Sequence, residues 1–498
     1  MAKRIITESS RTLMEYRLLP GYTSVDCSPD SISLRTPLVY SEDNKKKYYL
    51  NVPLVSAAMQ SVSGAQMGIE LAKLGGAAFI FCSQSIESQA EMVKKIKNHK
   101  AGFVKPQTMQ ADMKVKEMFE IRKKSGYSTF PVVDKNDLFV GLISKWDYDV
   151  SLHSESLIKG RMIKKENIEV GTNITDLVEA NQILLESHKS VLPILDNDGK
   201  LLSMVFRKDI NDQLDFPLEI HDEKKRLITV AAINTHDFKE RVKLLAKEEV
   251  DVLAIDSSDG HTQYQADTIR WISDKYTQIP VIGGNIITAE GFRFLVEAGA
   301  SAIKVGMGGG SICITQEQKG TGRGLATTII EVVEERDDHF KETGKYIPVI
   351  ADGGVTSTKD VTIALALGAD YVMMGRYFAR MEESPTEKIV VNNRVMKPYW
   401  GEGSTRAQNW KSKRYNQGKF VEGVEGMVEY AGHLRDNMEE TLAKIRSSMG
   451  TCGAMNISEF HKLAELEVLS ALSIKEGKPH DIYLSTENRD NQDYHSSE

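Results

Sequence analysis

Eight short apolar runs, each bounded by Gly, Pro, Asn or Asp, recur along the 498-residue chain. Their near-continuous apolarity is typical of strands that are buried on both faces of a parallel sheet. Helical patterns lie between most of them, and eight strand–helix units favour an α/β fold of the TIM (β/α)8 barrel type over an open doubly wound sheet. The runs are residues 52–59, 77–82, 228–233, 250–256, 279–285, 301–307, 347–354 and 370–376.

An internal repeat interrupts this series, because about 145 residues separate the second run from the third. "TFPVVDKNDLFVGLISKWD" (129–147) aligns without gaps on "VLPILDNDGKLLSMVFRKD" (191–209), and an amphipathic helical pattern precedes each copy. The repeated unit resembles a tandem pair of CBS modules, which often bind adenine or guanine nucleotides. We therefore predict a barrel with an inserted tandem CBS domain. The predicted domains are 1–102 and 223–498 for the two parts of the catalytic barrel and 103–222 for the regulatory insert.

The CBS resemblance implies a purine nucleotide effector for the insert. In the first copy, Ser144 and Asp147 match ribose and phosphate contacts of that family. The second copy keeps Asp209 but has Phe206 where a hydroxyl is expected, so one nucleotide site should be weak or altered. The alternative is a lid or spacer without a ligand.

Composition and charge argue against several classes of protein. A net charge of −7 gives no general attraction to nucleic acid or anionic lipid. No apolar run approaches the roughly 18 residues of a membrane helix, and the N-terminus lacks the apolar core of a signal peptide. The four cysteines form no CxxC and have no histidine at ligand spacing, which argues against a disulfide framework or a zinc site. We expect reduced thiols and a cytoplasmic protein.

Polar residues and glycines follow several predicted strands, at the end where active sites of this fold lie. Glycine lets backbone N–H groups approach a phosphate, and the loops after the seventh and eighth strands are the usual phosphate site of a TIM barrel. Two glycine clusters there, with an arginine beside the second, predict a phosphate site rather than two tight turns. The residues at these strand ends are Asp256, Ser257, Ser258, Asn285, Asp352, Gly353, Gly354, Gly375 and Arg376.

Cys313 lies beyond the sixth predicted strand, between two glycine clusters, in "KVGMGGGSICITQEQKGTGRG" (304–324). A lone cysteine is usually an inert buried thiol. Its place beside a predicted phosphate site favours a nucleophile, whose pKa peptide N–H groups could lower. Neither glycine cluster has the spacing and context of a dinucleotide-binding fingerprint, so we expect no Rossmann site.

With these residues identified, the chain resembles the inosine-5′-monophosphate (IMP) dehydrogenase family. The resemblance spans nearly the whole chain. It is carried by "PLVSAAMQSV", "IDSSDG", "GGGSICITQEQKGTGRG", "ADGG", "MMGR", "YWGEGS" and the inserted repeat. It implies oxidation of IMP to xanthosine monophosphate with NAD, in purine (GMP) biosynthesis. By match, Cys313 attacks C2 of the purine, hydride leaves for the nicotinamide, and water hydrolyses the covalent thioimidate.

The resemblance also implies roles for individual residues, a bound potassium ion and a homotetramer. The substrate contacts are Ser311, Asp352, Gly353, Gly354, Met374, Gly375, Arg376, Tyr399, Gly401, Glu402, Gly403 and Glu422. The residues on the NAD side are Asp256, Ser257, Ser258, Asn285, Gly306, Met307 and Gly308. The potassium ligands are Gly308, Gly310 and Cys313, with Glu476, Gly477 and Lys478 from a neighbouring subunit. Arg376 and Lys478 depart from residues found in some members, serine and glycine respectively.

Two routes of water activation stay open. One uses the Arg414–Tyr415 pair on a mobile flap of about residues 400–420, although deprotonating an arginine costs roughly 6 kcal/mol at neutral pH. The other relays a proton through Thr315 to Glu422. Two other functions are considered: a GMP reductase, against which the insert and the flap argue, and a nucleotide-sensing or filament-forming protein with an inactive barrel.

Overall fold

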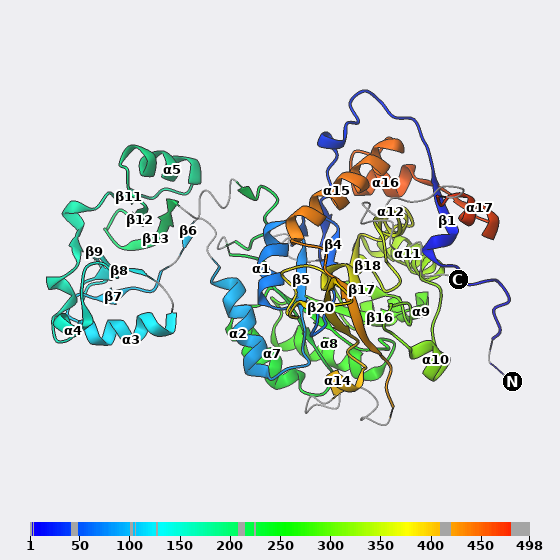
Figure 1. Ribbon diagram of the computed structural model, residues 1–498, viewed down its shortest axis with the longest axis horizontal. Coiled ribbons are helices and arrows are strands. Elements are labelled where there is room, and N and C mark those ends of the chain that lie inside the picture. The colour runs from blue at the N-terminus through cyan, green and yellow to red at the C-terminus, as the bar shows by residue number, and fades with distance from the viewer. Residues whose placement is uncertain are drawn as a thin grey trace.

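A computed structural model describes residues 2, 4–40, 48–99, 103–104, 106–125, 128–207, 215–223, 226–408 and 420–479. Figure 1 shows a large body that contains the barrel and a smaller body, built from residues of the predicted insert, set to one side of it. The smaller body joins the larger one near α2 (Ile86–Lys97).

The TIM barrel prediction is confirmed by a closed sheet of eight parallel strands, in the order β14-β15-β16-β17-β18-β19-β4-β5. Closure is seen at β14, where Val230 pairs with Val252 on one side and Phe79 on the other. Every residue of β4, β5, β14, β15, β17 and β19 is buried, which explains why these strands lack polar alternation. The strands are β4 Leu54–Ser56, β5 Ala77–Ile80, β14 Val230–Ile233, β15 Val252–Ile255, β16 Val281–Ile286, β17 Ala302–Val305, β18 Val349–Asp352 and β19 Tyr371–Met374.

Helices cover the outside of the barrel, and several of them begin at polar caps. The Thr288 hydroxyl accepts from Gly291 N–H at the start of α9, and Ser357 and Asp360 form a capping box at the start of α12. Among the described helices, none is both long and apolar enough to span a bilayer. The helices of this body are α1 Ala65–Lys73, α2 Ile86–Lys97, α7 Phe238–Lys247, α8 Gln263–Lys275, α9 Ala289–Glu297, α10 Thr315–Lys319, α11 Leu325–Thr343, α12 Thr358–Ala366, α13 Arg376–Ala379, α14 Thr405–Gln408, α15 Leu434–Thr451, α16 Ile457–Leu463 and α17 Ala471–Glu476.

Smaller antiparallel sheets lie outside the closed barrel sheet. The early strand β1 pairs antiparallel with the late strand β23, which brings residues 16–19 beside residues 465–468. A three-stranded antiparallel sheet, β20-β21-β22, follows β19, and β21 and β22 flank the predicted flap. The elements are β1 Tyr16–Leu19, β2 Thr36–Pro37, β3 Tyr49–Leu50, β20 Ile389–Val391, β21 Arg394–Trp400, β22 Glu425–Glu429 and β23 Glu465–Val468, with 3-10 turns at Leu13–Glu15 and Pro29–Ser31.

The described part of the insert contains two four-stranded sheets, in the orders β10-β9-β8-β7 and β11-β12-β13-β6. The two sequence copies fold alike: β8 pairs with β9 and β12 with β13, each with a bulge at the equivalent position. In both turns an aspartate, Asp134 or Asp196, accepts two backbone N–H groups. The elements are β6 Phe103–Val104, β7 Met109–Gln110, α3 Val115–Ser125, β8 Thr129–Val133, β9 Phe139–Ser144, α4 Val150–His153, β10 Ile163–Lys164, β11 Gly171–Thr172, α5 Leu177–Glu186, β12 Val191–Leu195 and β13 Leu201–Phe206, with 3-10 turns at Ile158–Gly160 and Lys165–Asn167.

The two copies share an apolar core formed by Phe139, Leu142, Leu195 and Met204. The insert is therefore one packed unit with internal pseudo-symmetry.

A buried ion cluster lies where the chain leaves the barrel for the insert and where it returns. The ammonium group of Lys97, at the end of α2, lies 3.0 Å from the Asp222 carboxylate and 2.5 Å from that of Asp251. Lys97 is 3% exposed, so its charge needs these partners. The bridge from Lys97 to Asp222 closes the base of the insert.

Candidate active site

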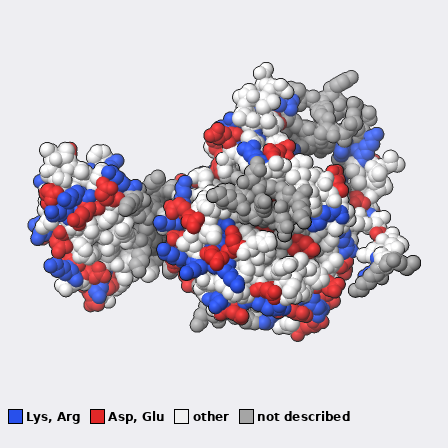
Figure 2. Space-filling view, turned by 90° about the horizontal axis from the view of Figure 1, so that it is seen from below, with Lys and Arg blue, Asp and Glu red and all other residues white. Residues whose placement is uncertain are grey.

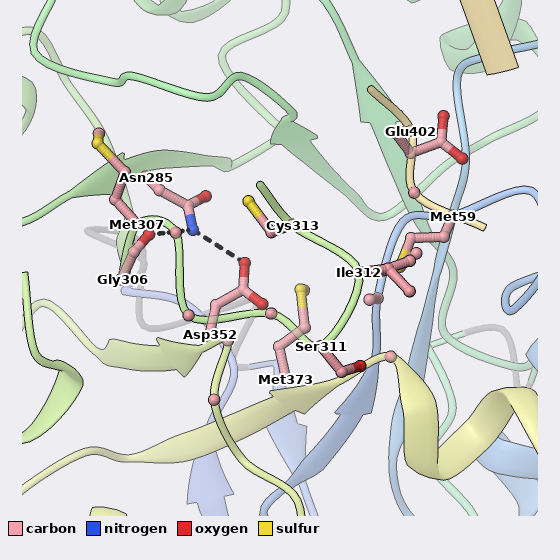
Figure 3. Close-up of a pocket in the computed structure, with 18 of the residues that line it drawn as sticks. Met59, Asn285, Gly306, Met307, Ser311, Ile312, Cys313, Asp352, Met373 and Glu402 are labelled. Atoms are coloured by element: carbon pink, nitrogen blue, oxygen red, sulfur yellow. Dashed lines mark hydrogen bonds between the residues drawn. The ribbon is translucent and has the colours of Figure 1, made fainter. Parts of the chain in front are cut away.

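A pocket of about 220 Å³ opens at the carboxyl ends of the barrel strands (Figure 3). The pocket brings together every residue that the sequence placed in the site, apart from Arg414, Tyr415, Glu476, Gly477 and Lys478. The lining residues are Ala57, Ala58, Met59, Asp256, Ser257, Ser258, Asn285, Lys304, Gly306, Met307, Gly308, Gly309, Gly310, Ser311, Ile312, Cys313, Thr315, Asp352, Gly353, Gly354, Val355, Thr356, Met373, Met374, Gly375, Arg376, Tyr399, Gly401, Glu402, Gly403 and Glu422.

The Cys313 thiol begins a chain of three side chains. Its sulfur lies 3.1 Å from the Thr315 hydroxyl, which donates to the Glu422 carboxylate at 3.0 Å. Cys313 is half-buried, whereas Thr315 and Glu422 are each 4% exposed. The arrangement therefore gives an accessible sulfur a path for protons to a buried carboxylate.

The backbone around Cys313 forms an antiparallel ladder of three segments, 401–403, 422–424 and 312–314, which we call the mouth ladder. Gly401 N–H donates to the Val424 carbonyl and Glu422 N–H to the Gly403 carbonyl, at 3.1 and 3.0 Å. On its other edge, residues 422–424 pair with 312–314, with Cys313 opposite Gly423. The mouth ladder continues the β21–β22 hairpin to the pocket and carries Cys313 and Glu422 on neighbouring segments.

A polar triad lies beside Cys313 at the ends of three strands. The Asn285 side-chain amide donates to Asp352 Oδ2 at 2.9 Å and to the Gly306 carbonyl at 2.8 Å (Figure 3). The Lys304 ammonium group donates to Asn285 Oδ1 and lies 3.4 Å from Asp352 Oδ2. These contacts fix one Asp352 oxygen and leave the carboxylate able to accept bonds from ligand hydroxyl groups.

Glycines let the loops after β17 and β18 approach each other. A Cβ at Gly306 would lie 2.0 Å from the Asp352 carbonyl oxygen, and Gly353 and Gly354 have φ values of 92° and 70°. Gly375 and Arg376 follow β19 on the next loop. Both residues line the same pocket, and backbone N–H groups and a guanidinium have the chemistry to bind a phosphate.

Tyr399 and Ser311 close the same side of the pocket and are hydrogen-bonded to each other. Burial, with a smaller contribution from Asp352, raises the pKa of the Tyr399 phenol to about 12. Tyr399 therefore stays a neutral hydrogen-bonding group at physiological pH.

The Glu402 side chain lies on the opposite side of Cys313 from Asn285 and Met307 (Figure 3). Its carboxylate accepts the Gln60 N–H at 2.6 Å and the Ser83 hydroxyl. Burial raises the pKa of Glu402 to about 7, and these two hydrogen bonds oppose the shift. The sequence placed Glu402 at the purine ring. Glu402 does line the pocket, but its carboxyl group contacts the loops after β4 and β5.

Glycine carbonyls of the Cys313 loop are available to a cation such as potassium. The Gly308 carbonyl accepts the Gln316 side-chain amide at 3.1 Å, and the Gly310 carbonyl accepts Cys313 N–H at 3.0 Å. A carbonyl oxygen has two lone pairs, so each can still face an ion. The donor chemistry fits potassium, but this loop alone supplies an incomplete shell.

Not every predicted residue can be placed in the pocket. Arg414 and Tyr415 lie outside the described residues. Glu476, Gly477 and Lys478 do not line the pocket of their own chain. Glu476 is the last residue of α17, Gly477 caps this helix beside Arg17, and Lys478 follows.

Sequence reasoning missed several lining residues, of which Lys304 is the most informative. It stands alone as a charge in the apolar run 301–307, and this lone charge was a signal that could have been used. Met59, Ile312 and Met373 carried no comparable signal, because apolar residues near strand ends usually belong to the core.

Comparisons with known proteins agree on one family. Residues 10–480 match the family model described as the IMP dehydrogenase / GMP reductase domain. The chain is 46% identical over 489 residues to inosine-5′-monophosphate dehydrogenase of Tritrichomonas foetus, covering 96% of this chain and 97% of that protein. It is 35% identical to the enzymes of that name from Aquifex aeolicus (96% of each chain) and Escherichia coli strain K12 (97% and 98%).

Among solved structures, the fold resembles that of a GMP reductase from Trypanosoma brucei, a cysteine-to-alanine variant in complex with guanosine 5′-monophosphate. The TM-score is 0.82 at 24% identity, with 96% of this chain and 98% of that chain covered. The 4% left out amounts to about 20 residues, far fewer than the insert contains. The insert therefore cannot separate a dehydrogenase from a reductase, contrary to our sequence-based argument.

Proposed function

The chain belongs to the IMP dehydrogenase / GMP reductase family, and from this premise we propose that it oxidises IMP to xanthosine monophosphate with NAD, for guanine nucleotide biosynthesis. The observation that carries the proposal is the match over 96% of the chain to relatives named IMP dehydrogenase, at up to 46% identity. The hydrogen-bonded side chains of Cys313, Thr315 and Glu422 supply groups suited to hydride transfer and to the hydrolysis that follows it.

In the first half-reaction, the Cys313 thiol gives up its proton and its sulfur forms a bond to C2 of the purine, while the C2–N3 double bond opens and its electron pair moves to N3, to re-form that bond when hydride leaves. The hydrogen on C2 then leaves with its electron pair, and NAD supplies the acceptor for that hydride. A thioimidate remains on Cys313. In the second half-reaction, water adds to C2, loses a proton and expels the Cys313 sulfur, giving xanthosine monophosphate and the free thiol.

Either Glu422 or the flap could take the proton from this water. Glu422 is joined to the Cys313 neighbourhood by the Thr315 hydroxyl, so it can accept a proton over one relay step. Arg414 and Tyr415 offer the alternative route on the flap, whose closure would replace NAD after hydride transfer.

The substrate would lie with its sugar-phosphate between two groups of residues. Asp352, held by Asn285 and Lys304, is suited to accept from ribose hydroxyls. The phosphate would meet backbone N–H groups of Gly354 and Gly375, the hydroxyls of Ser311 and Tyr399, and the Arg376 guanidinium. The remaining contacts predicted from the family are Gly353, Met374, Gly401, Glu402, Gly403 and Glu422.

NAD would enter from the side of the pocket that holds Asn285 and Met307. Its other proposed contacts are Asp256, Ser257, Ser258, Gly306 and Gly308. Potassium would bind the carbonyls of Gly308, Gly310 and Cys313, completed by Glu476, Gly477 and Lys478 of a neighbouring subunit in a homotetramer. The ion would hold the Cys313 loop in shape.

For the insert, we propose a regulatory tandem CBS domain that binds a purine nucleotide. Its first copy has a preformed turn in which the Asp147 carboxylate accepts the Ser144 hydroxyl at 2.8 Å and its N–H at 2.5 Å. Asp209 of the second copy lies outside the described residues. None of the four cysteines forms a disulfide among the described residues, which agrees with the cytoplasmic location that we propose.

GMP reductase is the second candidate, favoured by the fold similarity to a solved reductase. The purified protein should be mixed with IMP and NAD, and separately with GMP and NADPH, while absorbance of the reduced cofactor is followed. We expect NADH to form in the first mixture and a nucleotide adduct on Cys313 by mass spectrometry. Consumption of NADPH with GMP, and no reaction with IMP, would overturn the proposal in favour of the reductase.

A further inference from the structure

The Glu402 side chain links the mouth ladder to the barrel wall. Its carboxylate accepts one hydrogen bond from Gln60, in the loop after β4, and another from Ser83, in the loop after β5. These two partners are 342 and 319 residues away in sequence. One buried carboxyl group therefore connects the ends of two barrel strands to the segment that begins the predicted flap.

Further hydrogen bonds strengthen the same junction. The Gln60 side chain donates to the Ser83 carbonyl at 2.7 Å and accepts the Trp400 indole N–H at 2.9 Å. The Ser61 hydroxyl donates to the Trp400 carbonyl at 3.3 Å. Residues 400–402 are thus held from the side of the barrel, while the mouth ladder holds them from the side of the pocket.

The mouth ladder transmits this position to the reacting groups. Residues 401–403 pair with 422–424, which carry Glu422, and those pair with 312–314, which carry Cys313. The triad of Asn285, Lys304 and Asp352 is held by the barrel strands β16, β17 and β18, whereas Cys313 and Glu422 are paired within the mouth ladder. The distance between Cys313 and a substrate ribose bound at Asp352 depends on how firmly the mouth ladder is held.

We propose that Glu402 is a positioning residue, whose carboxyl group, bonded to Gln60 and Ser83, fixes the mouth ladder and so places Cys313 and Glu422 against the substrate. The inference rests on the proposed function and assigns the side chain a role apart from any purine contact by its backbone. A misplacement of about 1 Å at a reacting centre can cost roughly a hundredfold in rate, so one anchor can matter for catalysis.

The test compares Glu402→Gln with Glu402→Ala. Glutamine has the same shape, can accept the Gln60 N–H and can donate to the Ser83 oxygen, so it keeps both contacts without the charge. Alanine removes both. Glu387→Ala, at an exposed position before β20, serves as the matched control.

We expect the pre-steady-state burst of NADH at saturating IMP and NAD to slow by about tenfold or more in Glu402→Ala. In Glu387→Ala it should stay within about threefold of the wild-type rate, and Glu402→Gln should lose clearly less than Glu402→Ala because it keeps both hydrogen bonds. The KM for IMP should change less than kcat, because Asp352, Gly354, Gly375 and Arg376, which are proposed to bind ribose and phosphate, follow the barrel strands β18 and β19 rather than the mouth ladder. Equal losses in the Gln and Ala variants would show that the charge itself acts, and unchanged rates in Glu402→Ala would show that the anchor does nothing; either overturns the proposal.

A second readout does not depend on turnover. Amide hydrogen exchange at Ile314 and Val424, whose N–H groups pair within the mouth ladder, should be faster in Glu402→Ala than in Glu402→Gln. Equal exchange in the two variants would count against the anchor. If wild-type protein gave no NADH, the proposed function would fail. The hydrogen-exchange measurement would still decide whether the Glu402 carboxyl group holds the mouth ladder in place. Should Glu402→Ala not fold, Ser83→Ala removes one of the two bonds, and wild-type burst and exchange rates in that variant would refute the role.

Discussion

The buried carboxyl group of Glu402 makes the free energy of unfolding depend on pH, and the isosteric variant Glu402→Gln should remove this dependence. Burial raises its pKa from 4.5 to about 7, while in the unfolded chain the ordinary value applies. Between these values the folded protein binds a proton that the unfolded chain has lost, so the stabilising contribution is fully present below about pH 4.5 and is lost as pH rises through about 7. A difference of about 2.5 units corresponds to about 3 kcal/mol of unfolding free energy.

Burial is the largest cause of this shift, and the hydrogen bonds from Ser83 and Gln60 oppose it. The charged groups on adjoining segments are Glu422, on the next segment of the mouth ladder, and Arg406, which lies 3.9 Å from the centre of the Trp400 ring. Both remain in Glu402→Gln. A comparison of the variant with wild type therefore isolates the titration of one carboxyl group.

The assay is urea denaturation of wild type and Glu402→Gln at pH 5 and pH 8, followed by tryptophan fluorescence of the barrel transition. Relative to wild type, the variant should become more stable by about 3 kcal/mol between the two pH values. Infrared difference spectra of the two proteins should show a protonated carboxyl band that disappears near pH 7. A stability difference that stays constant within about 1 kcal/mol, together with the absence of that band, would refute the reasoning.

Three further predictions concern the thiol, the relay and the ion cluster at the insert. Cys313→Ala should form no covalent adduct with IMP and NAD by mass spectrometry; an adduct in this variant would contradict the nucleophile assignment. Thr315→Val should slow thioimidate hydrolysis by about tenfold or more but change the NADH burst little, and equal losses in both steps would speak against the relay to Glu422. Lys97→Met should destabilise the protein by about 3–5 kcal/mol in denaturant titrations, because it removes the ammonium group that lies 2.5 Å from the nearly fully buried Asp251, whereas Asp222 keeps its ion pair with Arg226. Lys94→Met, on the exposed side of the same helix, is the control; a similar small effect in both would show that the cluster is not needed.

The barrel could be predicted from the sequence because its strands have a simple physical signature. All eight apolar runs became the eight strands of the closed sheet, since strands buried on both faces have few polar positions. The repeat at 129–147 and 191–209 became two matching strand pairs with bulges at equivalent positions. The antiparallel sheet β20-β21-β22 was not predicted, because its half-exposed strands lie in a segment rich in charges and turns.

The site was predicted less completely, for a different physical reason. Residues at strand ends can be read from the sequence because the fold places all such ends at one face. The Ser83–Glu402 contact cannot be predicted from the sequence, because it joins two loops more than 300 residues apart and neither residue type indicates which residue it will contact. The roles assigned to Arg414 and Tyr415 stay predictions, as do those of Glu476, Gly477 and Lys478.

The buried bridge between Lys97 and Asp222 has a consequence for how such a protein can change over evolution. Since the departing and returning chains are held 3.0 Å apart at their ammonium and carboxylate groups, the roughly 120 residues between them start and finish at nearly the same point. Their length, composition or even presence can vary while the pairing of the eight parallel strands is kept. The insert is attached to the barrel at one place, so selection can replace the insert without changing the barrel.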